Sequence, residues 1–375
     1  MSRFSASATG ADDAVACSGP CCGVSRRGFL KTLAAAGAAS AIPAATLPGI
    51  SLSTTAFAQQ PPADKRRVID VHHHYFPQAF KDSSGREGSL PPLVRDWSPT
   101  RMLEEMDKNN IEKSVLSLAS VPVGWFRMKP EELRPLVRSL NEEGAKLVQT
   151  NKGRHGLFAY VSCSDVEGSL REIAYAYDTL KADGIEMSTS FGDKWPGDPA
   201  FVPVFEELNR RKAIVYFHPL APFCCGNLVK GVQDSWLEYP YDTGRAILSL
   251  LFNGNLAKFR DINWIFSHSG GALPYLSNRI DWQSRPVKNL KEIAPEGVLA
   301  EFKRLHYETA NAASTPAIAG LLKLVPISQV MYGSDFPYVT SQYNLANLRA
   351  NGLSDDDVKA IEYGNAEKLI PALKG

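Results

Sequence analysis

The chain has 375 residues, of which 41 are basic and 40 acidic, so its formal net charge is +1 with the seven histidines neutral. This balance gives no sign of a nucleic acid or an anionic membrane surface as partner, and we expect neither. A chain of this length suits one large α/β barrel, which typically takes about 250 residues and more with insertions.

The first 58 residues are predicted to be an export signal. The segment Ser25–Lys31 (SRRGFLK) resembles the twin-arginine consensus, and an Ala/Gly-rich stretch of modest hydrophobicity follows at 32–45. Two prolines interrupt the apolar region, whereas a membrane span needs about twenty mostly apolar residues. We therefore expect cleavage after the small-residue site Ala56–Ala58, no retained membrane anchor, and a periplasmic mature domain at 59–375.

Eight short β-rich runs alternate with amphipathic stretches in the mature chain, which predicts parallel strands joined by crossover helices. The predicted strands are 68–71, 114–118, 157–161, 184–187, 213–217, 263–267, 305–308 and 330–333. The predicted helices are 101–109, 130–150, 169–182, 199–211, 243–259, 271–282, 316–324 and 355–363. Because eight strands close a barrel, the sequence predicts a (β/α)8 TIM barrel with helical and loop insertions.

Two insertions, at 76–98 and 219–240, follow the first and fifth predicted strands. Each begins close to residues that could bind a metal. We expect these insertions to form the wall of a pocket.

Three predicted strands run into residues that commonly bind metals. The first leads into His72-His73-His74, the fifth into His218 and the eighth into Asp335. The two-residue period of a strand places His72 and His74 on one face and turns His73 to the other. Because the carboxyl ends of barrel strands meet at one mouth, the sequence predicts one metal site at His72, His74, His218 and Asp335.

Neutral imidazoles with one carboxylate suit zinc, with manganese as the alternative, and one coordination position stays open for water or substrate. A tag-like or surface histidine run is the other interpretation of 72–74, but this run is internal and follows an apolar strand. Twin-arginine substrates normally cross the membrane folded, so the ion can be installed in the cytoplasm before export. Asp70 is expected to share the strand face of His72 at a deeper level.

His268 lies in the segment Ser267–Gly271 (SHSGG), where glycines allow the backbone to approach a ligand. Histidine has an unperturbed pKa of about 6.5 and can therefore transfer protons near neutral pH. We predict that His268 acts as a general acid or base rather than as a ligand, and a hydrogen-bonded core histidine is the alternative. Asp335 is the second candidate for proton handling. His155 and His306 lie at less suitable positions and are given no role.

Taken together, these motifs resemble the amidohydrolase superfamily, in particular the branch of aminocarboxymuconate semialdehyde decarboxylase and, within it, the 6-methylsalicylate decarboxylase-like group. The resemblance is carried by 69–74, 217–219, 268–271 and 333–337, with further matches at 97–99, 106–107, 120–123 and 258–261. It implies that the predicted metal ligands are the family's ligands and that His268 is its catalytic histidine. It also implies a small carboxylic acid as substrate and a homodimer.

The resemblance also leaves open how the substrate is held. The family decarboxylase has a tryptophan soon after its His-Pro pair, whereas this chain continues with 220–225 (LAPFCC). The family's carboxylate-binding arginine matches no single position, so Arg95 and Arg101 are both candidates. Trp125, Phe126 and Phe223 are candidates to clamp an aromatic ring, with plain packing as the alternative.

Two further comparisons with the family concern the metal count and the cysteines. Binuclear members use a modified lysine on the fourth strand, but 184–187 contains none, so we expect one metal, with Glu186 supporting the site or the barrel. We expect the adjacent Cys224 and Cys225 to pack as small apolar groups. The alternatives are that they are oxidised or that they face the pocket.

These inferences predict a metal-dependent, non-oxidative decarboxylase of an aromatic or unsaturated acid, such as a salicylate-type acid. The alternative is hydrolysis of an amide, ester or lactone at the same site, with Asp335 or His268 handling the proton. A non-catalytic metal-binding protein is a third interpretation, and it predicts a closed coordination sphere.

Overall fold

The computed structural model describes residues 67–85 and 90–374. These described residues form one compact unit. The predicted leader, its cleavage point and the boundary at 58 lie outside the described residues. No described helix is long and apolar enough to cross a membrane.

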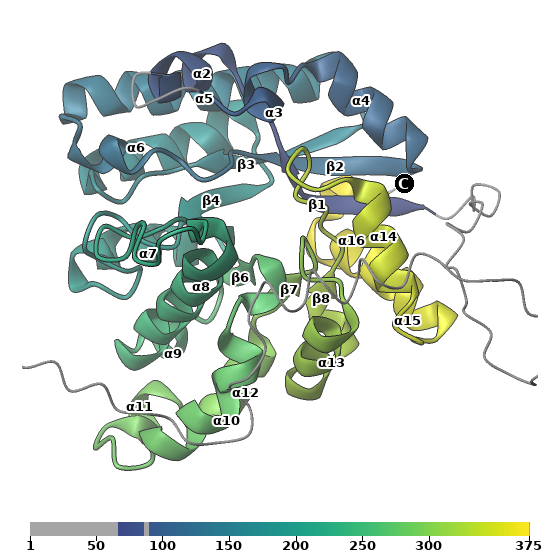
Figure 1. Cartoon of the computed structure of the whole chain (residues 1–375). Coiled ribbons are helices and arrows are strands. Elements are labelled where there is room, and N and C mark those ends of the chain that lie inside the picture. The colour runs from purple at the N-terminus through teal and green to yellow at the C-terminus, as the bar shows by residue number, and fades with distance from the viewer. Residues whose placement is uncertain (1–66, 86–89, 375) are drawn as a thin grey trace, which may run out of the picture. The chain divides into compact units, whose positions relative to one another are not determined.

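Eight parallel strands follow one another around a barrel in chain order, which confirms the predicted fold (Figure 1). The strands are β1 Val68–His74, β2 Ile111–Ser117, β3 His155–Tyr160, β4 Gly184–Ser188, β5 Ile214–His218, β6 Asn263–Phe266, β7 His306–Glu308 and β8 Val330–Met331. The first and last strands meet where the amides of Val71 and His74 donate to the carbonyls of Tyr332 and Phe336, both at 3.0 Å.

Helices cover the outside of the barrel between successive strands (Figure 1). They are α2 Gln78–Gly85, α3 Pro92–Arg95, α4 Pro99–Lys108, α5 Pro130–Thr150, α6 Val166–Tyr175, α7 Val202–Arg210, α8 Asp234–Phe252, α9 Asn255–Lys258, α10 Leu273–Ser284, α11 Leu290–Ile293, α12 Val298–Arg304, α13 Thr315–Leu324, α14 Ser341–Arg349, α15 Asp355–Lys359 and α16 Asn365–Leu369.

Local sequence signals explain well-predicted helices such as α4. Its N-cap residue Ser98 accepts a hydrogen bond from the amide of Arg101, and Pro99 occupies the first turn, where a proline amide is not needed. Met102 and Met106, four residues apart, bury the same face.

Some predicted boundaries were wrong. Helix α8 begins at Asp234, inside the predicted second insertion, and contains Pro240. A proline removes one helical hydrogen bond but does not always end a helix. Helices α12 and α14 were not predicted, because they are only seven and nine residues long and give little periodic signal.

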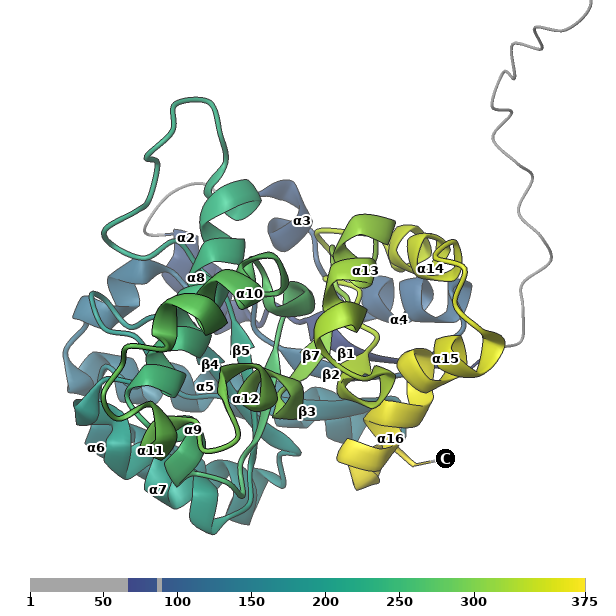
Figure 2. The ribbon, with the colours of Figure 1, turned by 90° about the horizontal axis from the view of Figure 1, so that it is seen from below.

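The barrel interior is an apolar cluster drawn from most of the strands. It consists of Ile69, Val71, Val115, Phe158, Ile214, Tyr216, Ile265 and Met331, and it packs against Ala366, Ile370 and Leu373. The C-terminal segment thus closes this part of the barrel, beside β1 and β3 in Figure 2.

A register shift interrupts β1 between Asp70 and His73. Ile69 and Val71, the neighbours of Asp70, both belong to the interior cluster, so Asp70 lies on the other face of the strand. His72 contributes to the cluster of donors at the barrel mouth. The prediction that Asp70 shares the strand face of His72 was therefore wrong. Strict alternation fails here since a bulge changes which residues point inward. Asp70 instead accepts hydrogen bonds from the amides of His72 and Ser334.

Candidate metal centre

Four buried side chains converge at the carboxyl ends of β1, β5 and β8. The Nε2 atoms of His72 and His74 lie 2.9 Å apart, and Nε2 of His74 lies 3.1 Å from Oδ1 of Asp335. The ring centroid of His218 lies 5.1 Å from that of His72 and 4.8 Å from that of His74. One ligand atom from each of these four residues falls within 4.8 Å of the others.

His218 provides a direct test of whether this cluster fits a metal. Its Nδ1–H donates to the carbonyl of Pro219 at 3.0 Å, whereas its buried Nε2 has no hydrogen-bond partner. An unpaired buried nitrogen is costly unless it has another partner. Three imidazoles and one carboxylate around a common point therefore fit a divalent metal ion.

The ionisation of these side chains also suits metal binding. Burial lowers the pKa of His74 to about 4 and holds the pKa of His218 well below its usual value. Burial opposes ionisation of Asp335, but hydrogen bonds from His72 and His74 outweigh it and keep the pKa of this carboxyl well below its usual value. Two neutral imidazoles and an ionised carboxylate are forms that bind metals. Burial lowers the pKa of His72, but Glu308 and Asp335 outweigh burial and raise this pKa to about 10, so a metal ion has to displace one proton from the ring.

His268 lies beside this cluster. Its ring centroid is 5.0 Å from that of His72 and 5.9 Å from that of His218. Its Nδ1–H donates to the carbonyl of Ala310 at 2.8 Å, which leaves Nε2 as the nitrogen that can exchange a proton with a bound molecule. A left-handed turn, with φ of 53° at His268 and 56° at Ser269, presents the ring at the end of β6.

Glu308, the last residue of β7, was given no role by the sequence analysis. It is fully buried and accepts hydrogen bonds from Nδ1 of His72 at 2.8 Å and from the amide of His268 at 2.9 Å. Its position at the end of a predicted strand, equivalent to that of the ligands, was the signal that could have identified it.

A cavity of about 960 Å³ opens over these residues. His218, His268 and Asp335 line its inner part. Both predicted insertions contribute to its wall, as expected: the first through Phe80, Leu90 and Val94, and the second through Gln233, Trp236 and Tyr239. Pockets of about 300–1,000 Å³ hold small organic ligands, so this one has ample room for a substituted aromatic ring.

The candidate arginines lie elsewhere. Arg95 is exposed and pairs with Asp96 at 2.7 Å, and Arg101 donates to the backbone carbonyl of Asp96. Neither belongs to the described residues that line the cavity.

The three candidate aromatic residues pack among other side chains. Trp125 is buried and contacts Phe80, with 5.7 Å between the ring centroids. Phe126 and Phe223 pack against each other with 6.5 Å between the ring centroids. The described part of the cavity wall contains none of the three.

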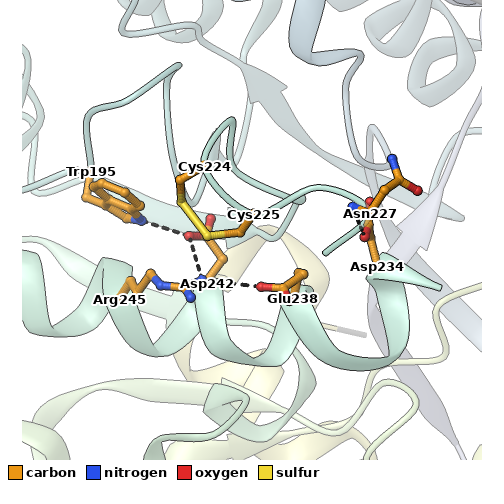
Figure 3. The surroundings of a disulfide bond; sticks show 8 residues. All are labelled: Trp195, Cys224, Cys225, Asn227, Asp234, Glu238, Asp242 and Arg245. Carbon is orange, nitrogen blue, oxygen red and sulfur yellow. Dashed lines mark hydrogen bonds and ion pairs between the residues drawn. A yellow bond between two sulfur atoms is a disulfide. The ribbon is translucent and has the colours of Figure 1, made fainter. Parts of the chain in front are cut away.

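Cys224 and Cys225 are joined by a disulfide in the loop between β5 and α8 (Figure 3), so the expectation that they pack as separate thiols was wrong. Adjacent thiols can be oxidised where the loop brings both sulfur atoms together.

Nearby, Nε1–H of Trp195 donates to Asp242 at 2.7 Å, and Arg245 lies 3.8 Å from the same carboxylate (Figure 3).

Glu186 is buried on β4 and accepts a hydrogen bond from the amide of Leu118 at 2.7 Å. Burial raises the pKa of this carboxyl well above its usual value. A protonated carboxylic acid is a poor metal ligand, so Glu186 supports the barrel near the site.

The sequence matches the amidohydrolase family over residues 69–372 and a twin-arginine translocation pathway signal sequence over residues 23–43. It is 32% identical to decarboxylase yanB of Aspergillus niger, over 81% of this chain and 87% of that protein. It is 30% identical to 6-methylsalicylic acid decarboxylase of Penicillium expansum, over 82% of this chain and 97% of that protein.

Among solved structures, the fold is similar to that of a dihydroxybenzoic acid decarboxylase from a Polaromonas species, described with bound manganese and the inhibitor 2-nitroresorcinol. The TM-score is 0.73 at 21% identity, and the match covers 83% of this chain and 98% of that one. The family match spans the whole barrel, including every residue of the metal centre. The chain therefore belongs to the amidohydrolase family.

Proposed function

We propose that the protein is a metal-dependent decarboxylase, a carboxy-lyase that releases carbon dioxide from an aromatic carboxylic acid such as a salicylate-type acid. The observation that carries this proposal is the position of His268, which lies beside a four-residue donor set but outside it, at the wall of a cavity that fits an aromatic ring. The two curated relatives described above are named decarboxylases, which supports the same reaction.

In this proposal, His72, His74, His218 and Asp335 hold one divalent ion, zinc or manganese. The manganese in the Polaromonas structure supports the second choice. A bound ion would supply positive charge that stabilises negative charge on the substrate oxygen atoms. Three imidazoles, with His72 neutral once the metal has displaced its proton, and one carboxylate would leave a coordination position for the substrate.

His268 supplies the proton. Its Nδ1–H is held by the carbonyl of Ala310, so Nε2 faces the bound acid. The protonated Nε2 transfers its proton to the ring carbon that carries the carboxylate. The bond between this carbon and the carboxylate then breaks, carbon dioxide leaves, and the electron pair restores the aromatic ring. The neutral imidazole regains a proton from solvent.

Trp236, Tyr239 and Tyr338 line the cavity and are suited to contact the substrate ring. Arg95, Arg101, Trp125, Phe126 and Phe223, which the sequence suggested for this role, contact other parts of the protein. The second candidate function is metal-assisted hydrolysis, which uses the same donor set but has less support from the relatives.

We also propose how the protein is exported and in which oligomeric state it works. A leader cleaved after Ala58 would leave 59–375 as a mature periplasmic enzyme, already loaded with metal in the cytoplasm. We also propose a homodimer. Mass spectrometry of the exported protein and light scattering of the purified enzyme test these two statements.

The direct test incubates metal-analysed mature protein with a panel of hydroxybenzoic and methylsalicylic acids and measures carbon dioxide. We expect release that requires the metal and falls at least about 100-fold in His268→Asn, because a general acid typically contributes 10²–10⁴-fold. Asn keeps a side-chain amide that can reach the carbonyl of Ala310. If no acid in the panel reacts although one metal is bound, hydrolysis becomes the better assignment, and lactones and amides should be screened.

A further inference from the structure

One carboxylate connects both functional parts of the site. Oε1 of Glu308 accepts hydrogen bonds from Nδ1 of His72 and from the amide of His268, and Oε2 accepts from the amide of Ala310 at 2.6 Å. Glu308 is fully buried, so no water competes for these three donors. The ring of His72 and the turn that carries His268 are therefore held by the same side chain.

The contact with His72 determines how this imidazole can serve as a ligand. Once a metal ion replaces the proton on Nε2, a histidine whose Nδ1–H donates to a carboxylate presents its free electron pair at Nε2, and the carboxylate makes that nitrogen a stronger donor. Nε2 of His72 is the atom that lies 2.9 Å from Nε2 of His74, inside the donor set. Glu308 thus selects the tautomer that points a lone pair into the metal centre.

The contacts with the main chain hold His268. Its φ of 53° lies in a region that residues other than glycine seldom occupy, so the turn needs external support. Glu308 binds the amide at this position and also the amide of Ala310, whose carbonyl accepts the Nδ1–H of the His268 ring. The carboxylate therefore holds the two main-chain positions, one after β6 and one after β7, that orient the imidazole.

The carboxylate of Glu308 fits beside residue 333 only because that residue is a glycine and has no side chain. A Cβ atom at Gly333 would overlap Oε2 of Glu308 and would lie 2.8 Å from Cβ of His72. Gly333 stands two positions before the ligand Asp335. A glycine at 333 is therefore part of the same arrangement.

We propose that Glu308 is a shared positioning residue that couples metal affinity to proton delivery, by fixing the tautomer of His72 and the orientation of His268. The part that concerns His268 rests on the proposed decarboxylase function, whereas the part that concerns His72 does not. Loss of Glu308 should therefore weaken metal binding and, separately, slow the reaction of the fully loaded enzyme.

The test compares Glu308→Gln with the wild-type protein. Glutamine keeps the size of the side chain but has only one acceptor oxygen, so at least one of the three donors loses its partner. Metal affinity is measured by competition with a chromophoric chelator, without substrate, and kcat and KM are then measured at saturating metal. Glu172→Gln is the matched control, because Glu172 is also buried and accepts hydrogen bonds, from Arg138 and Asn141, away from the metal centre.

We expect metal binding to weaken about 10- to 100-fold in Glu308→Gln, as for other carboxylates that support a metal-bound histidine. At saturating metal, kcat should fall at least about tenfold with KM within about twofold, because proton delivery rather than substrate binding is impaired. Glu172→Gln should match the wild type in both measurements. His268→Asn should lose kcat but keep its metal affinity within about threefold, which separates the two roles.

Metal affinity within threefold of the wild type in Glu308→Gln would overturn the proposal, even if the variant unfolds at a lower temperature. A loss of metal affinity with normal kcat at saturating metal would overturn the coupling to His268. If Glu308→Gln does not fold, Glu308→Asp replaces it, since the shorter side chain withdraws the carboxylate from its three donors without adding atoms beside His72.

Failure of the proposed reaction would be recognised separately. If no acid is decarboxylated by the wild type, the orientation of His268 is read from the Nδ1–H signal in NMR spectra of zinc-loaded protein, identified by its loss in His268→Asn. We expect this signal to broaden or disappear in Glu308→Gln. An unchanged signal would overturn the part of the proposal that concerns His268.

Discussion

The imidazole of His73 stacks on the ring of Phe336, with 4.9 Å between the ring centroids and 18° between the planes. His73 lies on β1 and pairs with Phe336, in the segment that follows β8, through an isolated parallel bridge, so the contact is part of the seam that closes the barrel. Nδ1–H of His73 also donates to Asp70 at 2.8 Å. The middle histidine of the triplet therefore supports the barrel, while its two neighbours belong to the candidate metal centre.

We expect Asp70→Ala to destabilise the protein by about 3 kcal/mol or more. Asp70 accepts hydrogen bonds from the ring of His73 and from the amides of His72 and Ser334, and removing it leaves three buried donors unpaired. Urea unfolding measures the loss. Asp356→Ala, at a side chain that is 95% exposed, is the control and should change stability by less than about 0.5 kcal/mol. Equal stability of the two variants would contradict this role.

Adding zinc or manganese to metal-free protein should raise its melting temperature by several degrees. A ligand at 100 times its dissociation constant stabilises the folded state by about 2.7 kcal/mol. Differential scanning fluorimetry records the shift. His218→Ala should abolish most of it, because this variant removes the donor whose Nε2 has no other partner. Calcium, which prefers oxygen ligands, should give no shift and serves as the control ion.

Trp236→Ala should raise KM about tenfold with little change in kcat, because the indole lines the cavity outside the metal centre. Trp282→Ala is the matched control. Trp236 and Trp282 are 65% and 62% exposed, but only the first is among the described residues of the cavity wall. Steady-state kinetics on the best acid found in the panel distinguish them. The same KM for both variants would exclude Trp236 from substrate binding.

Stability should fall as the pH is lowered from 7 to 5. Burial lowers the pKa of His155 to about 3 and that of His306 to about 4, so both stay neutral in the folded protein while they become charged in the unfolded chain. The unfolded state then binds more protons, and each histidine costs about 2 kcal/mol of stability at pH 5. The loss of stability begins near pH 6.5, the pKa of a histidine in the unfolded chain, and ends near the pKa values of His155 and His306 in the folded protein.

Urea unfolding at pH 7 and pH 5 measures this dependence. His155→Gln, which cannot be protonated, should recover about 2 kcal/mol of the difference between the two pH values. Comparing each protein with itself at the two pH values removes any change in stability that the substitution causes by packing. An unchanged pH dependence in this variant would show that His155 is not responsible.

The clustering of His72, His74, His218 and Asp335 could be predicted because each lies at or just beyond the end of a strand and the barrel brings all strand ends to one mouth. Glu308 lies at an equivalent position but was missed, since a single glutamate at the end of a strand is common and only its three-dimensional partners distinguish it. The cavity wall was predicted only as two insertions. Which side chains face inward depends on where α8 begins, and Pro240 concealed that start.

The bulge in β1 is a second feature that the sequence did not predict. Alternation along the strand correctly placed His72 and His74 together, but it failed for Asp70 because an irregularity of one residue reverses the inward face. Such an irregularity belongs to the pairing of β1 with β2 and has no strong local signal in the sequence.

The proposed metal ligands are far apart in the sequence: His72 and His74 lie on β1, His218 ends β5, and Asp335 lies 261 positions after His74. During synthesis, the first two histidines leave the ribosome long before the aspartate does. A nascent chain that ends before β8 therefore has three of the four donors and an open seam. With the metal bound as proposed, the full donor set would exist only after translation of Asp335, beyond the eighth strand, so an incomplete chain would hold the ion less tightly than the finished one.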